Sequence, residues 1–288
     1  MRIGAVFPQV EIGTDPAAIR DWAQAVEELG YTHVLAFDHV LGANPDRPGG
    51  FKGPYTYRHQ FYEPLVLFGF LAAVTRRVEL VTGILILPQR QTALVAKQAA
   101  TVDVLCGGRL RLGVAVGWNP VEFDALGEPF GDRGQRIEEQ IEVLRALWTR
   151  ELVTFTGRWH RIPDAGINPL PVRRPIPVWM GGESEPVLRR AARLADGWFP
   201  HFRPGPAAQA IVDRLHRQIK EVGREPAAFG IEGRVTLAQV PPGAWAGELV
   251  AWRAMRGLTH LCVHTVGLGL KTPDDHVQTL RRFKEVSG

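Results

Sequence analysis

The sequence has little cysteine, little lysine and no long apolar run. Its two cysteines, Cys106 and Cys262, are far apart in the chain, which excludes a disulfide framework or a cysteine zinc site and suits a reducing cytoplasm. The longest apolar run, residues 64–74, is about half the length that a membrane span needs. The first residues are too poor in apolar side chains for a secretory signal, and no basic cluster is interleaved with aromatic residues. We therefore expect a cytoplasmic protein that binds neither membranes nor nucleic acid.

The charge is unevenly distributed although the net value is only +4. Residues 1–144 carry 13 Lys+Arg and 17 Asp+Glu, a net charge of −4, and residues 145–288 carry 21 and 13, a net charge of +8. One interpretation is a solvated surface in a chain that uses 29 Arg and 5 Lys. The other is that the C-terminal half receives an anionic ligand.

Short β-branched and apolar runs alternate with amphipathic stretches along the whole chain. Several runs are continuously apolar, which is typical of parallel strands buried on both faces. The expected strands are residues 2–7, 33–37, 78–84, 110–116, 177–180, 197–200, 229–237 and 259–264. The expected helices are residues 15–29, 62–74, 92–105, 132–149, 184–195, 206–222, 244–256 and 273–285.

Eight strand–helix units of about 36 residues predict an α/β fold, a single (β/α)8 TIM barrel over residues 1–288. The alternative is a doubly wound open sheet, but no glycine-rich nucleotide fingerprint follows the first strand. Residues 40–60 and 151–175 interrupt the repeat as insertions after strands two and four, the second with a hairpin around Thr156 and Gly157. Long loops of this kind usually shape the site of a barrel.

The residues that follow each strand are the candidates for chemistry, because a barrel carries its site at the carboxyl ends of its strands. Gly181-Gly182-Glu183-Ser184 offers two small residues and the free N–H groups of a helix start, which is a phosphate-binding pattern. The alternative is an ordinary glycine loop with an N-cap serine.

A second candidate is Asp38-His39, which offers a hydrogen-bond acceptor and a group that moves protons near neutral pH, or simply a bonded loop pair. Gly83 inside a strand indicates a bulge or a close approach, or a small residue in a tight interior. We expect no metal, since His260 and His264 share a strand face without a third ligand nearby.

Three segments together resemble the luciferase-like monooxygenase superfamily, and most closely its coenzyme F420-dependent oxidoreductases. They are AFDHV at residues 36–40, the stretch 78–128, and RRPIPVWMGGESEPVLRRAARLADGWFP at residues 173–200. The resemblance implies a (β/α)8 barrel that binds a reduced flavin or deazaflavin at the strand C-termini. It also implies a non-prolyl cis peptide in the strand-three bulge, behind the central ring of the cofactor.

The resemblance assigns expected roles residue by residue. Asp38 hydrogen-bonds near the ring, and His39 donates or accepts the substrate proton, so these two are the expected catalytic residues. The further cofactor-binding residues that it implies are Gly83, Ile84, Val116, Gly117, Trp118, Gly181, Gly182, Glu183, Ser184 and His201. Phe51, Tyr55, Tyr57 and Trp118 form the expected substrate pocket, and because Trp118 replaces the acidic residue of sugar-phosphate dehydrogenases, we expect a small apolar or aromatic substrate.

The first functional hypothesis is an oxidoreductase that transfers a hydride between coenzyme F420 and an organic substrate. The positive C-terminal half suits the oligoglutamate tail of F420, and the arginine-rich composition suits a high-GC genome. The alternatives are an FMN-dependent monooxygenase that uses dioxygen, and a non-catalytic flavin-binding protein. The family is often dimeric, so we expect a homodimer.

Overall fold

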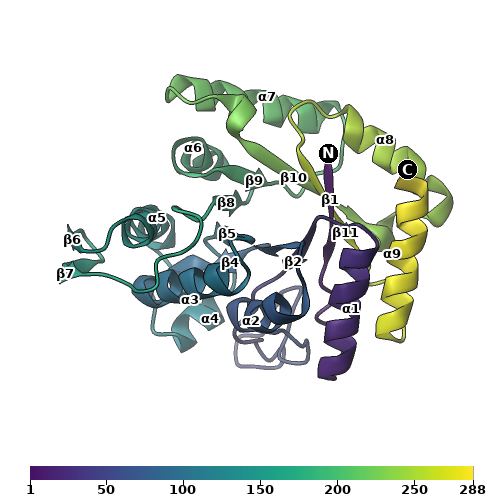
Figure 1. Cartoon of the computed structure of the whole chain (residues 1–288), viewed down its shortest axis with the longest axis horizontal. Helices are drawn as coiled ribbons and strands as arrows, with labels where there is room; N and C mark the ends of the chain where they lie inside the picture. The colour runs from purple at the N-terminus through teal and green to yellow at the C-terminus, as the bar shows by residue number, and fades with distance from the viewer. Residues whose placement is uncertain (288) are drawn as a thin grey trace.

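The computed structural model describes residues 1–287 and forms a closed barrel of parallel strands with helices outside it (Figure 1). The strands are β1 (Arg2–Val6), β2 (His33–Ala36), β3 (Glu79–Thr82), β4 (Leu85–Ile86), β5 (Leu110–Ala115), β8 (Val178–Gly181), β9 (Gly197–Phe199), β10 (Gly230–Thr236) and β11 (His260–His264). Their order around the barrel is β3-β2-β1-β11-β10-β9-β8-β5, and β4 prolongs β3 beyond a bulge. The pairing of β3 with β5, with Leu80 opposite Leu110, closes the ring. The TIM barrel predicted from the alternating pattern is therefore confirmed.

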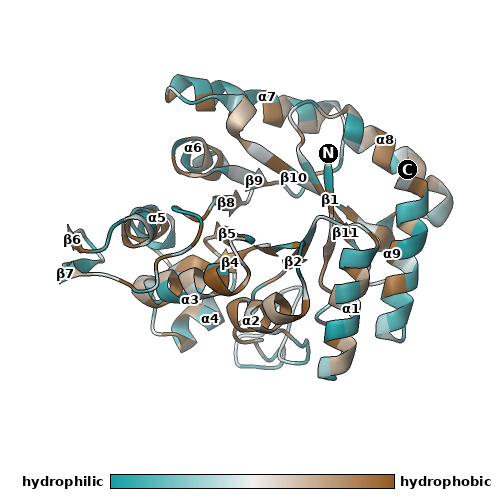
Figure 2. Cartoon of the chain, viewed as in Figure 1, coloured by the Kyte–Doolittle hydropathy of each residue, from teal (hydrophilic) through white to brown (hydrophobic). Residues whose placement is uncertain are grey.

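Helices cover the outside of the barrel. They are α1 (Pro16–Glu28), α2 (Pro64–Val74), α3 (Thr92–Leu105), α4 (Pro120–Ala125), α5 (Arg133–Thr149), α6 (Glu185–Leu194), α7 (Pro206–Glu221), α8 (Trp245–Ala254) and α9 (Pro273–Ser287). Hydrophilic residues line much of the outer surface of α9, whereas α2 is mostly hydrophobic (Figure 2). Within residues 1–287, no helix has the length and apolar character to cross a membrane.

Local sequence sets the start of α1. The Asp15 carboxylate accepts a hydrogen bond from the N–H of Ala17 at 2.9 Å, and Pro16 occupies the first turn, where its missing N–H costs nothing. The apolar residues Ile19, Trp22 and Val26 then fall on one buried face, because they recur at helical spacing.

Both expected insertions are present. The segment between β2 and α2 has no helix or strand, and the segment after α5 holds the antiparallel hairpin of β6 (Val153–Thr156) and β7 (Arg161–Ala165). The sequence did not predict α4, a six-residue helix capped by Asn119, whose side chain accepts from the N–H of Val121 at 3.1 Å. A helix this short has too few residues for apolar periodicity to reveal it.

Candidate functional site

A cavity of about 520 Å³ lies at the carboxyl ends of the barrel strands. It is lined by residues of β4, β5, β8 and β10, by the loops that follow β2, β3, β5, β8 and β9, and by one residue of α6. They are Phe37, Asp38, His39, Pro54, Tyr55, Gly83, Ile84, Ile86, Ala115, Val116, Gly117, Trp118, Gly181, Gly182, Glu183, Ser184, Val187, His201 and Arg234. The structure thus brings together the expected catalytic and cofactor-binding residues, with Tyr55 of the expected substrate pocket.

The wall on the β3 side is a bulge at Gly83 and Ile84, where the peptide bond is cis, as the resemblance implied. The N–H of Gly83 donates to the carbonyl of Ala36 at 2.7 Å, which ties the bulge to β2. A Cβ on Gly83 would lie 2.2 Å from Leu35 Cδ2, so no larger side chain fits without displacing that leucine. A glycine is therefore required here by close approach, which was one of the two interpretations of its position in the sequence.

Asp38 is buried at the end of β2, and both of its carboxylate oxygens are bound by the protein. Oδ2 accepts from the N–H of Ile86 at 2.8 Å, and Oδ1 accepts from Arg90 Nη2 at 2.8 Å. Burial raises the pKa of Asp38, against the opposing effect of the Arg90 charge and the Ile86 N–H. Asp38 thus fixes the segment after the bulge, and its expected contact with a cofactor remains a proposal.

His39 is held in one orientation by a buried glutamate and aromatic rings. Its Nδ1 lies 2.9 Å from Glu122 Oε2, while Glu122 Oε1 accepts from the N–H of Val40 at 2.7 Å. The ring centroid of His39 is 4.9 Å from that of Phe61 and 5.5 Å from that of Trp118.

The carboxylate of Glu122 determines which His39 nitrogen is free. Burial opposes the charge of Glu122, but the hydrogen bonds from His39 and from the backbone of residues 40 and 41 lower its pKa below the usual value. An ionised Glu122 accepts from Nδ1–H, which leaves Nε2 as the ring nitrogen without a proton in the neutral imidazole. No interaction with Nε2 of His39 is present within residues 1–287.

The expected phosphate loop follows β8 and leads into α6. Ser184 occupies the N-cap position, yet its side chain makes no cap hydrogen bond. Gly182 adopts φ = 116°, which disfavours other residues, and its carbonyl accepts from Trp198 Nε1 at 2.6 Å. The Glu183 side chain turns away to accept the backbone N–H of His201. Pro186 has no N–H, and the N–H of Val187 donates to the Ser184 carbonyl at 2.9 Å, so the N–H groups of Ser184 and Glu185 and the uncommitted Ser184 hydroxyl are the donors that fit a phosphate here.

The expected substrate residues divide between two cavities. Tyr55 and Trp118 line the 520 Å³ cavity, and Phe51 lies outside that lining, with its ring centroid 6.0 Å from that of Trp118. Tyr57 is exposed and lines a neighbouring cavity of about 270 Å³, which His39 and Tyr55 also border. The loop after β2 therefore packs against the loop after β5 and separates the two cavities.

Three charged residues of the site lay outside the sequence prediction: Arg90, Glu122 and Arg234. Arg90 and Glu122 act through Asp38 and His39, from 52 and 83 residues away in the chain. Arg234 lies within β10 and lines the cavity. An arginine in the predicted strand 229–237, which also contains Glu232, was the one available signal, since a charge in a barrel strand must face a polar interior or a ligand.

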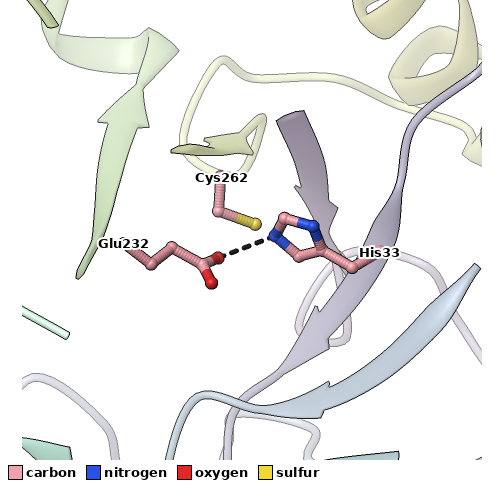
Figure 3. Close-up of side chains that lie close together, drawn as sticks. All are labelled: His33, Glu232 and Cys262. Atoms are coloured by element: carbon pink, nitrogen blue, oxygen red, sulfur yellow. Dashed lines mark hydrogen bonds and ion pairs between the residues drawn. The ribbon is translucent and has the colours of Figure 1, made fainter. Parts of the chain in front are cut away.

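Below the cavity, the barrel interior holds a buried polar cluster of His33, Glu232 and Cys262 (Figure 3). Their ligand atoms lie within 4.8 Å of one another. The Glu232 carboxylate is already committed, because Oε1 is 2.8 Å from His33 Nε2 and Oε2 is 2.6 Å from Arg111 Nη1. These ion pairs hold the pKa of Glu232 below its usual value although burial opposes the charge. The cluster therefore has an internal role as a charge-balanced network.

The positive charge of the C-terminal half does not gather at the cavity. Many of its arginines pair with carboxylates on the outer surface, as Arg193 does with Glu138 and Arg256 with Asp213. Among the residues that line the cavity, Arg234 is the one that is an arginine. Arg203 is exposed and lies two positions after His201 on the same loop. This leaves two cations of that half beside the candidate site.

The fold and the cavity are those of a barrel protein with its candidate site at the carboxyl ends of the strands. Comparison of the sequence with known protein families identifies the family. Residues 1–277 match the luciferase-like monooxygenase family, and the chain belongs to it. Its members are oxidoreductases, which supports an enzyme.

Relatives and solved structures agree with this assignment. An uncharacterized protein of Mycobacterium tuberculosis is 35% identical over 224 residues, 76% of this chain and 77% of the relative. The FMNH2-dependent dimethylsulfone monooxygenase of Pseudomonas putida is 35% identical over 158 residues, 54% of this chain and 43% of that protein. The monooxygenase RslO1 from Streptomyces bottropensis has a TM-score of 0.76 at 20% identity, covering 99% of this chain and 98% of that one. The coenzyme F420-dependent tetrahydromethanopterin reductase of Methanopyrus kandleri has a TM-score of 0.64 at 16% identity, covering 99% and 84%. At these identities the two structures show the shared fold alone.

Proposed function

We propose that this chain is an oxidoreductase that transfers a hydride between coenzyme F420, bound in the 520 Å³ cavity, and an organic substrate. The observation that carries the proposal is the convergence on one cavity of the Gly83–Ile84 bulge, the His39–Glu122 pair and the α6 N-terminus. When bound, the deazaflavin supplies the hydride chemistry, and the protein supplies orientation, desolvation and proton transfer.

The position of each residue in the cavity suggests its role in binding or proton transfer. The backbone of Gly182 and Ser184 at the start of α6 would hold the phosphate, and the Ile84 side chain would support the ring. Nε2 of His39 would exchange a proton with the substrate, with Glu122 as a positioning residue that fixes the tautomer. The apolar surfaces of Phe37 and Trp118 would exclude water.

Arg203 supports F420 as the cofactor. His201 contacts Glu183 through its backbone N–H, so the loop that bears Arg203 lies beside the proposed phosphate site. Arg203 Nη2 donates to the Gln239 carbonyl at 3.2 Å, and the remaining N–H groups of this exposed cation suit an oligoglutamate tail, which FMN lacks.

FMN is the second candidate, with dioxygen as the oxidant, and the dimethylsulfone monooxygenase of Pseudomonas putida supports it. The test is an equilibrium titration of the purified protein with oxidised F420 and with FMN. We expect F420 to bind at least tenfold more tightly, and Arg203→Ala to weaken F420 binding without affecting FMN. Tighter binding of FMN would overturn the choice of cofactor. Bound cofactor that no reductant or substrate reduces or oxidises would instead indicate the non-catalytic alternative.

We also propose a homodimer formed through α2 and α3, which pack side by side. Val66 is 71% exposed and Phe70 38% exposed on α2, and Leu94 is 52% exposed on α3. Adjacent exposed apolar side chains of this size are typical of an interface. Sedimentation velocity should show a dimer that Val66→Glu dissociates, whereas Val250→Glu, at a comparably exposed position on α8, should leave it intact. A monomeric wild-type protein would contradict this proposal.

A further inference from the structure

Arg234 is a partly buried cation in the candidate site without a carboxylate partner. Within residues 1–287 its side chain takes part in no ion pair and donates no hydrogen bond. By contrast, the buried side chains of Arg111, Arg136 and Arg190 each pair with a glutamate. Keeping a guanidinium away from water without a countercharge is costly. The usual compensation is an acceptor that comes from outside the protein.

The groups around Arg234 do not supply such an acceptor. Its guanidinium carbon lies 5.4 Å from the ring centroid of Phe37, which in turn lies 5.5 Å from that of His264. Burial, followed by the charge of Arg234, lowers the pKa of His264 to about 3, so this histidine is neutral at physiological pH. Glu232 is two residues back on β10, but His33 and Arg111 already occupy both of its oxygens.

Arg234 comes from a different part of the barrel than the proposed cofactor wall, although it borders a small void with Gly83 and Ile84 of the bulge. The bulge, the Val116–Trp118 loop and the phosphate loop follow β3, β5 and β8, which are consecutive in the barrel. Arg234 comes from β10 and His264 from β11, on the opposite arc, and Phe37 follows β2, which neighbours β3. A molecule that lies between the two arcs is the reaction partner of the cofactor.

We infer that Arg234 binds an anionic oxygen of the substrate, a carboxylate or its equivalent, joined to an apolar or aromatic body. This inference rests on the proposed function, because it takes the β3–β5–β8 arc as the cofactor side. A guanidinium donates two parallel, coplanar hydrogen bonds to a carboxylate, and this geometry fixes the orientation of the carboxylate. Phe37, Tyr55 and Trp118 provide the apolar surface for the body of the substrate. The sequence predicted an apolar or aromatic substrate, and the structure adds the charged group to that description.

The test compares benzoate with benzamide, which has nearly the same shape and no charge. Calorimetric titration measures both ligands on the full-length protein, with and without bound cofactor. The variants are Arg234→Met, Arg234→Lys and, as a matched control, Arg217→Met at an exposed position on α7. Thermal unfolding of Arg234→Met verifies that the variant is folded.

We expect wild-type protein and Arg217→Met to bind benzoate at least tenfold more tightly than benzamide, since hydrogen bonds to charged groups are stronger than neutral ones. In Arg234→Met the preference should fall to less than twofold, and Arg234→Lys should keep part of it because it keeps the charge. Equal binding of the two ligands by the wild-type protein, or a preference that survives in Arg234→Met, would overturn the inference.

Cofactor titrations separate this inference from the proposed function. Arg234→Met should bind F420 and FMN within twofold of the wild-type affinity. A tenfold loss of cofactor affinity would assign Arg234 to the cofactor and overturn the inference. If the wild-type protein binds neither cofactor, the proposed function fails, while the benzoate preference of the cofactor-free protein still decides whether Arg234 forms an anion site.

Discussion

The exchange Glu122→Gln is the sharpest perturbation of the His39–Glu122 pair. The Glu122 carboxylate accepts from His39 Nδ1 at 2.9 Å and from the N–H groups of Val40 and Leu41 at 2.7 and 3.2 Å. A glutamine has nearly the same shape but one oxygen, and if that oxygen keeps the backbone bonds, its NH2 group faces Nδ1. Two donors cannot face each other, so His39 must move its proton from Nδ1 to Nε2.

The cost follows from these contacts. A hydrogen bond to a charged acceptor contributes about 1.5–3 kcal/mol, and a neutral one contributes about 0.5–1.5 kcal/mol. Replacing three charge-assisted bonds by neutral ones therefore lowers the free energy of unfolding by roughly 3 kcal/mol. We expect the melting temperature to fall by about 5 °C. The wrong tautomer should also lower the rate of proton transfer by about 100-fold or more, without changing cofactor affinity.

The assay combines denaturant unfolding with nitrogen NMR of 15N-histidine-labelled protein, in which His39→Gln assigns the His39 signals. The matched control is Asp124→Asn, an exposed acid on the same helix, α4. The difference in unfolding free energy between wild type and Glu122→Gln should have its full size above about pH 4.5. Because folding lowers the pKa of Glu122, it should shrink as the pH falls through the folded value. Unchanged His39 nitrogen signals, with an unfolding free energy within about 0.5 kcal/mol of wild type, would refute this reasoning.

Three further predictions follow from the geometry. Gly83→Ala should destabilise the protein by about 1–3 kcal/mol in denaturant unfolding, because its Cβ would overlap Leu35, whereas Gly243→Ala has open space and should be nearly neutral. Ser184→Ala should leave unfolding within about 0.5 kcal/mol of wild type, because this serine makes no cap bond, yet weaken cofactor binding several-fold in the titration; a matching loss of stability would point to a capping role instead. Glu27 accepts backbone N–H groups of Arg76, Arg77 and Val78, and although burial opposes its charge these bonds lower its pKa. Glu27→Gln should therefore be destabilised at pH 7 and converge with wild type as the pH falls below about 4.5; a difference that is constant with pH would contradict this.

The barrel could be predicted from sequence because its signals are local. Continuous apolar runs identify parallel strands, and the stretch around Ile19, Trp22 and Val26 shows how helical spacing marks the covering helices. The positions after each strand then follow from the fold alone, which is why Asp38, Gly83 and Gly182 could be placed at one end of the barrel.

The partners of these residues could not be predicted, because they depend on which loops meet in space. Glu122 reaches His39 only because α4 folds against the segment after β2, and no local pattern marks α4. The charge of the C-terminal half was also ambiguous in the sequence. Its arginines mostly pair at the outer surface, and it is the unpaired Arg234, within a predicted strand, that faces the cavity.

The most direct test of the account is a crystal structure of the protein with bound F420. The account predicts the deazaflavin ring against the Gly83–Ile84 bulge and the phosphate at Gly182 and Ser184, with Nε2 of His39 facing the substrate space. Density for the cofactor outside this cavity, or a ring that contacts neither the bulge nor the α6 N-terminus, would contradict the central claim.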